Sequence, residues 1–152
     1  MGCEQSDKVH DALLKSIQMT MMDMAFVDVI EAGDESEVHH SNVLYINFSQ
    51  PVNGGLILRF SKECKMMIVE NIHGSNWESL SSDEIDDCLL EVLNVLAGNF
   101  LNFYCGKESG HNMTFPQMLF DEEEIPKVSE YIPYYYDAEG VVFRVDVCVN
   151  QD

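Results

Sequence analysis

The stretch SSDEIDDCLLEVLNVLAGNFLNFY, residues 81–104, carries the strongest helix signal in the chain. Ser81 and Glu84 have the S-x-x-E spacing of a capping box, in which the two side chains satisfy exposed amides at the start of a helix. Apolar residues then recur every three or four positions as far as Phe103, which predicts a long amphipathic helix over residues 82–104. Such a helix must bury its broad apolar face against other elements of a core.

The rest of the chain supplies a second long helix and two sets of strands. Apolar residues at helical spacing predict the second helix over residues 6–23, and a short helix is expected over residues 62–72. Asn53-Gly54 lies between two apolar runs and predicts the turn of a hairpin, because both residues tolerate positive φ. The polar residues 32–41 and the acidic run 121–124 are expected to be loops. Strands are expected at 25–31, 43–49, 55–61, 112–119, 130–136 and 141–149, with a turn at 137–140.

The order of elements is therefore helix, three strands, then helix, three strands. We predict an α+β fold made of a duplicated helix-plus-three-strand unit. Its antiparallel six-stranded sheet carries two long helices packed on one face. Residues 1–152 are expected to form a single domain, since 152 residues is a normal domain size.

Composition argues against several classes of function. The chain has 27 acidic and 8 basic residues, and its net charge of −19 argues against nucleic-acid binding. It has no run of about 18 apolar residues, so we expect no membrane-spanning segment. Met1-Gly2-Cys3 fits the start of a myristoylation signal, but no basic cluster follows it, and we reject a lipid anchor. Without the apolar core of a signal peptide, the protein is expected to be cytoplasmic.

The cysteines do not suggest a disulfide framework or a metal site. Five cysteines occur, an odd number, and none forms a C-x-x-C pair. The histidines lie at no metal-ligand spacing from them. We therefore expect reduced thiols and no bound metal.

A narrow polar strip interrupts the apolar surface of the helix predicted over residues 82–104. Asp87, Glu91, Asn94 and Gly98 fall within roughly 60° of one another at about 100° per residue. The strip has no basic residue. Gly98 costs about 1 kcal/mol relative to Ala in a helix, and it leaves bare backbone that another protein could approach closely. The residues alone leave two interpretations open, a functional strip and a merely solvated one.

The spacing of these residues resembles the active-site signature of the CheC–CheX–FliY family of chemotaxis phosphatases. That signature reads [D/S]-x-x-x-E-x-x-N, followed after about 22 residues by Pro. Here Asp87, Glu91 and Asn94 are followed by Pro116, with 21 residues between Asn94 and Pro116. The expected order of elements also resembles the family fold over residues 8–149. The first helix carries no second E-x-x-N, so the chain is most similar to the single-signature CheX type, which implies a homodimer.

The resemblance implies a substrate and a role for each residue. The substrate is the aspartyl phosphate of a phosphorylated CheY-like receiver, a response regulator of two-component signalling. That partner supplies Mg²⁺ and a lysine, and this chain binds no cofactor. The resemblance gives Asn94 the task of holding a water in line with the scissile P–O bond and Glu91 the task of pairing with the lysine. Gly98 is expected to contact the partner. Asp87 is expected either to contact the partner as well or to stabilise the first turns of the helix against its macrodipole. Pro116 is expected to mark a bend in the following strand.

Two further interpretations stay open at this stage. One is a non-catalytic module of the same fold that binds a receiver or a component of the motor switch, because fold does not guarantee activity. The other is an acidic scaffold protein whose signature arose by chance. Release of phosphate from a receiver separates the enzyme from the module, and the orientation of Glu91 and Asn94 tests the scaffold.

Overall fold

A computed structural model describes residues 3–33, 43–107, 110–126 and 130–150. Residues 1–2 of the rejected lipid-anchor motif, and most of the loop expected at 32–41, lie outside these ranges. Two short 3-10 helices occupy Trp77–Ser79 and Glu122–Glu124, the second within the acidic run expected to be a loop. The three α-helices are α1 (Cys3–Ala25), α2 (Lys62–His73) and α3 (Ser82–Cys105). The strands are β1 (Val29–Glu31), β2 (Val43–Gln50), β3 (Asn53–Arg59), β4 (Asn112–Met113), β5 (Gln117–Leu119), β6 (Ile132–Ala138) and β7 (Val141–Asn150).

The strands form one antiparallel sheet in the order β1-β6-β7-β3-β2-β4, with β5 also paired to β2. The two halves of the chain exchange strands across this sheet. β1 of the first half pairs with β6 of the second, and β4 and β5 of the second half pair with β2 of the first. β3 and β7, the last strands of the two halves, pair at the centre. The predicted duplication is confirmed, and the sixth position of the sheet is divided between β4 and β5.

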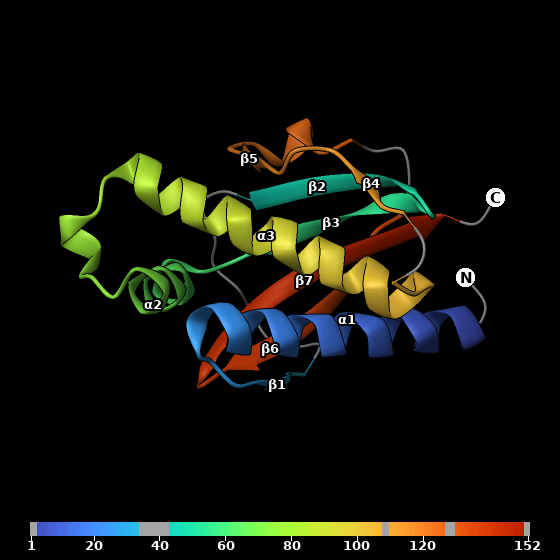
Figure 1. The fold of residues 1–152 in the computed structure, drawn as a ribbon, viewed down its shortest axis with the longest axis horizontal. Helices are drawn as coiled ribbons and strands as arrows, with labels where there is room; N and C mark the ends of the chain where they lie inside the picture. Colours follow the sequence, from blue (N-terminus) through green and yellow to red (C-terminus); the bar gives the residue numbers. More distant parts are fainter. Residues whose placement is uncertain (1–2, 34–42, 108–109, 127–129, 151–152) are drawn as a thin grey trace.

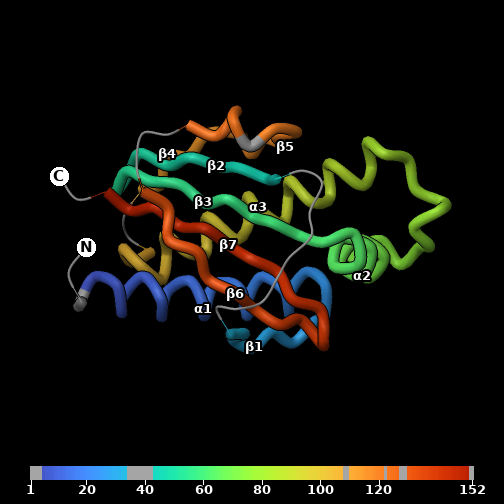
Figure 2. The backbone as a smooth tube through the Cα atoms, turned by 180° about the vertical axis from the view of Figure 1, so that it is seen from behind, coloured from blue at the N-terminus to red at the C-terminus, as the bar shows by residue number. Residues whose placement is uncertain are grey.

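The two long helices lie on one face of the sheet, as predicted (Figure 1). α1 and α3 run antiparallel and pack against each other, while α2 closes one end of the helical layer. Seen from behind, the sheet lies in front of both long helices (Figure 2). The molecule therefore has two layers, and the outer surface of α3 faces away from the sheet.

Alternation along the central strands places the main core between the sheet and the helices. Leu56 and Leu58 of β3 and Val145 and Val147 of β7 are buried in that core. The residues between them face the opposite side of the sheet, where Ile57 joins a smaller apolar cluster. The members of that smaller cluster are Val43, Tyr45, Ile57 and Ile125, with Leu119 and Tyr131 packed against them.

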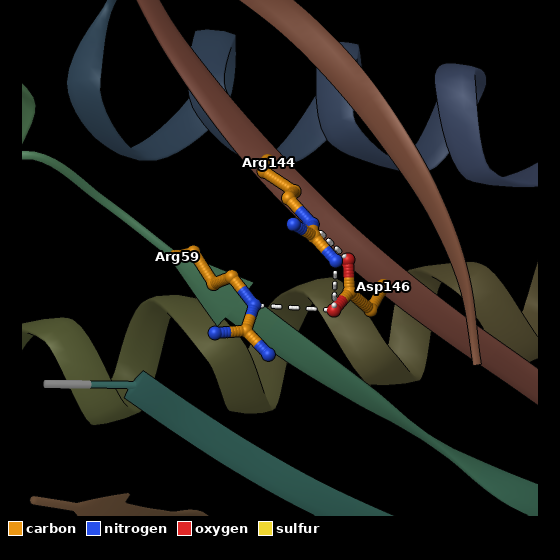
Figure 3. Close-up of polar contacts among 3 residues, drawn as sticks. All are labelled: Arg59, Arg144 and Asp146. Carbon is orange, nitrogen blue, oxygen red and sulfur yellow. Dashed lines mark hydrogen bonds and ion pairs between the residues drawn. The ribbon is translucent and has the colours of Figure 1, made fainter. Parts of the chain in front are cut away.

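A charged cluster joins β3 and β7 on the face of the sheet away from the long helices (Figure 3). Arg59 Nε donates to Asp146 Oδ2 at 3.1 Å, and Arg144 Nε donates to Asp146 Oδ1 at 2.6 Å. Burial acts to lower the pKa of Arg144, but the hydrogen bonds and the charge of Asp146 outweigh it and raise that pKa. One buried carboxylate on β7 thus binds two guanidinium groups, that of Arg144 on its own strand and that of Arg59 across the central strand pair.

The β2–β3 hairpin forms as predicted, but its turn lies elsewhere. Asn53 and Gly54 already belong to β3, and Pro51 and Val52 make the turn. A Cβ at Gly54 would lie 2.0 Å from the backbone oxygen of Cys148. Gly54 is therefore needed for close approach of two strands and not for a turn conformation.

The first expected strand is also shorter than its pattern suggested. α1 continues to Ala25, and only Val29–Glu31 form β1. The other predicted turn, at 137–140, is present. Gly140 has φ +97° and its N–H donates to Asp137 Oδ1 at 2.6 Å.

Candidate functional site

The polar strip lies on the outer surface of α3, as its spacing predicts. Asp87 and Glu91 are exposed, and Asn94 and Gly98 are half-buried. The opposite side of the helix is sealed in the core by Cys88, Leu89, Val92, Leu93, Leu96, Ala97, Phe100, Leu101 and Tyr104. Because these buried residues fix the rotation of α3, the four strip residues face away from the sheet.

The start of α3 is fixed by the predicted capping box. The Ser81 hydroxyl accepts from the Glu84 N–H at 3.1 Å, and the Ser81 N–H donates to Glu84 Oε1 at 3.1 Å. Hydrogen bonding from the Ser81 backbone lowers the pKa of the Glu84 carboxyl. Two otherwise orphan amides are satisfied in this way, so α3 begins at a defined residue and its later residues keep a defined register.

The middle of α3 is held against α1 by a polar contact beside Gly98. The Asn99 carboxamide donates to Thr20 Oγ1 at 3.0 Å, and the Thr20 hydroxyl donates to the Ser16 carbonyl at 2.7 Å. One residue further on, the Phe100 ring packs on Phe48 of β2 with 6.1 Å between ring centroids. The strip is therefore carried by a helix that is anchored to both α1 and the sheet.

The side chains of Glu91 and Asn94 are free of polar partners within the described part of the chain. Neither forms a hydrogen bond or an ion pair with another described residue. They are three residues apart, so their side chains leave the helix as neighbours on one face. The pair offers solvent one carboxylate and one carboxamide with unused donors and acceptors.

Gly98 has no packing reason for being a glycine. A Cβ built there would meet no atom within 4 Å outside its own helix backbone. Since Gly costs about 1 kcal/mol relative to Ala in a helix interior, its presence is not explained by contacts within the described protein. The bare backbone lies one turn beyond Asn94 and widens the approach to it.

Pro116 lies at a break in the edge strand, where a bend was predicted. Met113 pairs with Phe48, and Gln117 pairs with Tyr45. Four residue steps on the edge strand therefore face three on β2, so one extra residue forms a bulge that separates β4 from β5. The bend expected at Pro116 is present, whereas no role was expected for the neighbouring Phe115.

No metal centre accompanies these residues in the described ranges. There, no group of three or more His, Cys, Asp or Glu side chains is placed to hold a metal ion. The strip itself can accept and donate hydrogen bonds and can oppose a cation with two carboxylates. Its chemistry is that of positioning and recognition.

α3 is long and apolar enough to cross a membrane by length and composition alone. Among the described residues, no other helix passes this test. Half of its most apolar window is buried inside the protein. The same composition is that of a core helix, and α3 packs against both the sheet and α1.

The fold and the strip define a duplicated α+β domain that presents a carboxylate and a carboxamide from one long, anchored helix. A family model described as the chemotaxis phosphatase CheX matches residues 43–135, which include all of α3 and Pro116. The chain belongs to this family, as its signature indicated. No curated protein matches the chain.

Solved structures show the same fold. The chemotaxis protein CheX from Desulfovibrio desulfuricans superposes with a TM-score of 0.75 at 15% identity, covering 93% of this chain and 99% of that one. CheX in a CheX–CheY–BeF₃–Mg²⁺ complex from Borrelia burgdorferi gives a TM-score of 0.71 at 19% identity over 93% and 97% of the two chains. FliY from Thermotoga maritima gives 0.64 at 14% identity over 98% and 91%. At these identities the similarity establishes the fold.

Proposed function

We propose that this protein hydrolyses the aspartyl phosphate of a phosphorylated CheY-like response regulator. The observation that carries the proposal is the Glu91–Asn94 pair on the outer surface of α3, whose side chains have no polar partner within the described chain. Membership of the CheX family supports the reaction class. The Borrelia complex supports the class of partner, because there a CheX protein binds CheY.

Asn94 is the water-positioning residue in this proposal. Its carboxamide can accept a hydrogen bond from a water and donate another to a phosphoryl oxygen. Phosphoryl transfer passes through a loose transition state, so a water held in line needs little deprotonation before the bond breaks. Catalysis by positioning alone is therefore sufficient.

Glu91 sets the docking register. Its carboxylate pairs with the lysine of the receiver's phosphorylation site and so places Asn94 over the phosphoryl group. Asp87, one turn earlier on the same face, extends this contact. The Mg²⁺ of the reaction belongs to the receiver.

The cysteines of α3 do not favour a covalent cysteine mechanism. A cysteine phosphatase needs a thiolate with a lowered pKa. Cys88, the cysteine nearest the strip along α3, is buried in the core, and burial raises the pKa of its thiol. Burial likewise raises the pKa of Cys105 at the end of the helix. Direct attack by water is thus the reaction that this helix supports.

The cellular location proposed for this protein follows from that of its partner. Response regulators act in the cytoplasm, so we place this protein there as well. We also propose that it forms a homodimer, as the CheX type does. Analytical ultracentrifugation of the purified protein would report the mass directly, and a monomer at all concentrations would exclude the dimer.

The test is the decay of phosphorylated receivers. Purified receivers from the same genome are phosphorylated with a small-molecule donor, and phosphate release is followed with and without this protein. We expect at least one receiver to lose phosphate faster when the protein is present. Tight binding to a receiver carrying beryllofluoride, without faster decay of any phosphorylated receiver, would favour the non-catalytic module.

A further inference from the structure

The bulge between β4 and β5 pushes one aromatic side chain into solvent. Phe115 is 90% exposed, more than any other large apolar residue in the described ranges. The bulge is held to β2 on both sides. Before Phe115, Thr114 N–H donates to the Asn47 carbonyl at 2.8 Å and Asn47 N–H donates to Thr114 Oγ1 at 3.1 Å, and after it Gln117 pairs with Tyr45. The backbone that carries Phe115 is therefore anchored, although its ring contacts little of this chain.

The bulge lies level with Asn94 on the neighbouring helix. Phe100 packs on Phe48, and Asn94 lies six residues, or about 9 Å, before Phe100 along α3. Tyr45 lies three residues, or about 10 Å, before Phe48 along β2. Tyr45 pairs with Gln117, the first residue after the bulge.

Because α3 and β2 run in the same direction, the distances along them can be compared (Figure 1). The edge segment from β4 to β5 passes beside α3 (Figure 1). α3 also contacts β5 directly. A protein that docks on the Glu91–Asn94 face of α3 must therefore come close to the bulge between β4 and β5.

An exposed phenylalanine on a fixed bulge suits binding better than stability. Bulges next to functional sites commonly re-aim a side chain, and aromatic residues are enriched where protein surfaces meet. The net charge of −19 gives no long-range attraction for an acidic receiver. Apolar contact beside the strip can therefore supply affinity that long-range charge does not.

We infer that Phe115 is the apolar anchor on which the phosphorylated receiver docks. This inference rests on the proposed function and adds the residue that supplies affinity for the same partner. Phe115 buries its ring against an apolar patch of the receiver surface next to the phosphorylated aspartate. Asn94 acts on the phosphoryl group, and Phe115 holds the receiver there.

The test separates binding from chemistry. Phe115→Ala should raise both the KM for the phosphorylated receiver and the Kd for the receiver carrying beryllofluoride by roughly 10- to 100-fold. The kcat at saturating receiver should stay within about twofold, because uniform binding is lost and no transition-state contact is removed. Phe115→Leu should recover most of the affinity. Phe26→Ala is the matched control, because Phe26 is also exposed, at 73%, but directly follows α1 and is not part of the β4–β5 edge.

The outcomes test the phosphatase activity and the anchoring role of Phe115 separately. An unchanged Kd for Phe115→Ala overturns the anchor and leaves the phosphatase standing if the parent is active. A fall in kcat with unchanged KM also overturns it. If the parent binds receivers without hydrolysing them, the proposed function fails, and the ratio of Kd values still decides the anchor. If the parent binds no receiver, both fall together.

Discussion

Replacing Asn94 with alanine should lower activity and leave the fold intact or slightly more stable. A lost water-positioning group costs on the order of 10²-fold in rate, which is about 2.7 kcal/mol of transition-state free energy. Equal falls in kcat and in kcat/KM are expected, because the contact exists only in the transition state.

The effect of this substitution on stability follows from the surroundings of Asn94. Its side chain is half-buried and has no hydrogen bond to another described residue, so little is lost from the folded state. Alanine is a better helix former than asparagine by about 0.5 kcal/mol. The melting temperature should therefore stay the same or rise by about 1–2 °C in a protein of 152 residues. Activity and stability thus move in opposite directions, which a misfolded variant cannot imitate.

Asn102→Ala is the matched control. Asn102 is also half-buried on α3 and lies eight residues, or about 12 Å, beyond Asn94. It should show the same gain in stability with no loss of rate. The assay is single-turnover decay of a phosphorylated receiver, with thermal unfolding followed by circular dichroism. Parent-like decay with Asn94→Ala would refute the role, and early unfolding of that variant would make Asn94 a structural residue.

Three further outcomes are expected. The association rate constant for an acidic receiver should increase between 0.01 and 0.15 M salt, because the Debye length falls from about 30 to about 8 Å and distant repulsion is screened. A steep fall of this rate constant in stopped-flow measurements would point instead to a basic partner. Gly98→Ala should raise the free energy of unfolding by up to about 1 kcal/mol, because a Cβ there meets nothing within 4 Å, and should weaken receiver binding; unchanged affinity would remove Gly98 from the interface. Burial, with a smaller contribution from the charge of Glu63, raises the pKa of Cys64 from 9.0 to about 12. The folded state then holds this proton more tightly than the unfolded state, so its contribution to stability is complete below about pH 9 and is lost as pH rises toward 12. Urea unfolding from pH 7 to 10.5 should show this decline. Cys64→Ala, although less stable at every pH, should make the decline shallower, and an equally steep decline would contradict the assignment.

Local sequence signals predicted α3 and the strip because both depend on neighbours along the chain. The Ser81–Glu84 box spans one turn, and both of its hydrogen bonds form. The spacing of Asp87, Glu91 and Asn94 sets their angle around the helix whatever packs beneath it. The duplicated order of helices and strands could be read for the same reason.

Other local signals failed where a distant strand decided the outcome. Asn53-Gly54 has the composition of a turn, but the approach of Cys148 from β7 requires a glycine within β3. The run expected as one strand over residues 112–119 divides into two because its register is imposed by β2.

The sequence by itself determined that one long helix carries a carboxylate and a carboxamide on a bare outer face, since helical spacing fixes which residues share a side. Only the tertiary structure decided what surrounds that face. Arg59 and Asp146 are 87 residues apart and meet across the central strands. Phe115 comes level with Asn94 because β2 pairs with the edge strand on one side and packs under Phe100 of α3 on the other. Such contacts depend on pairing between segments that are far apart in the sequence, so the pattern of any one short segment cannot predict them.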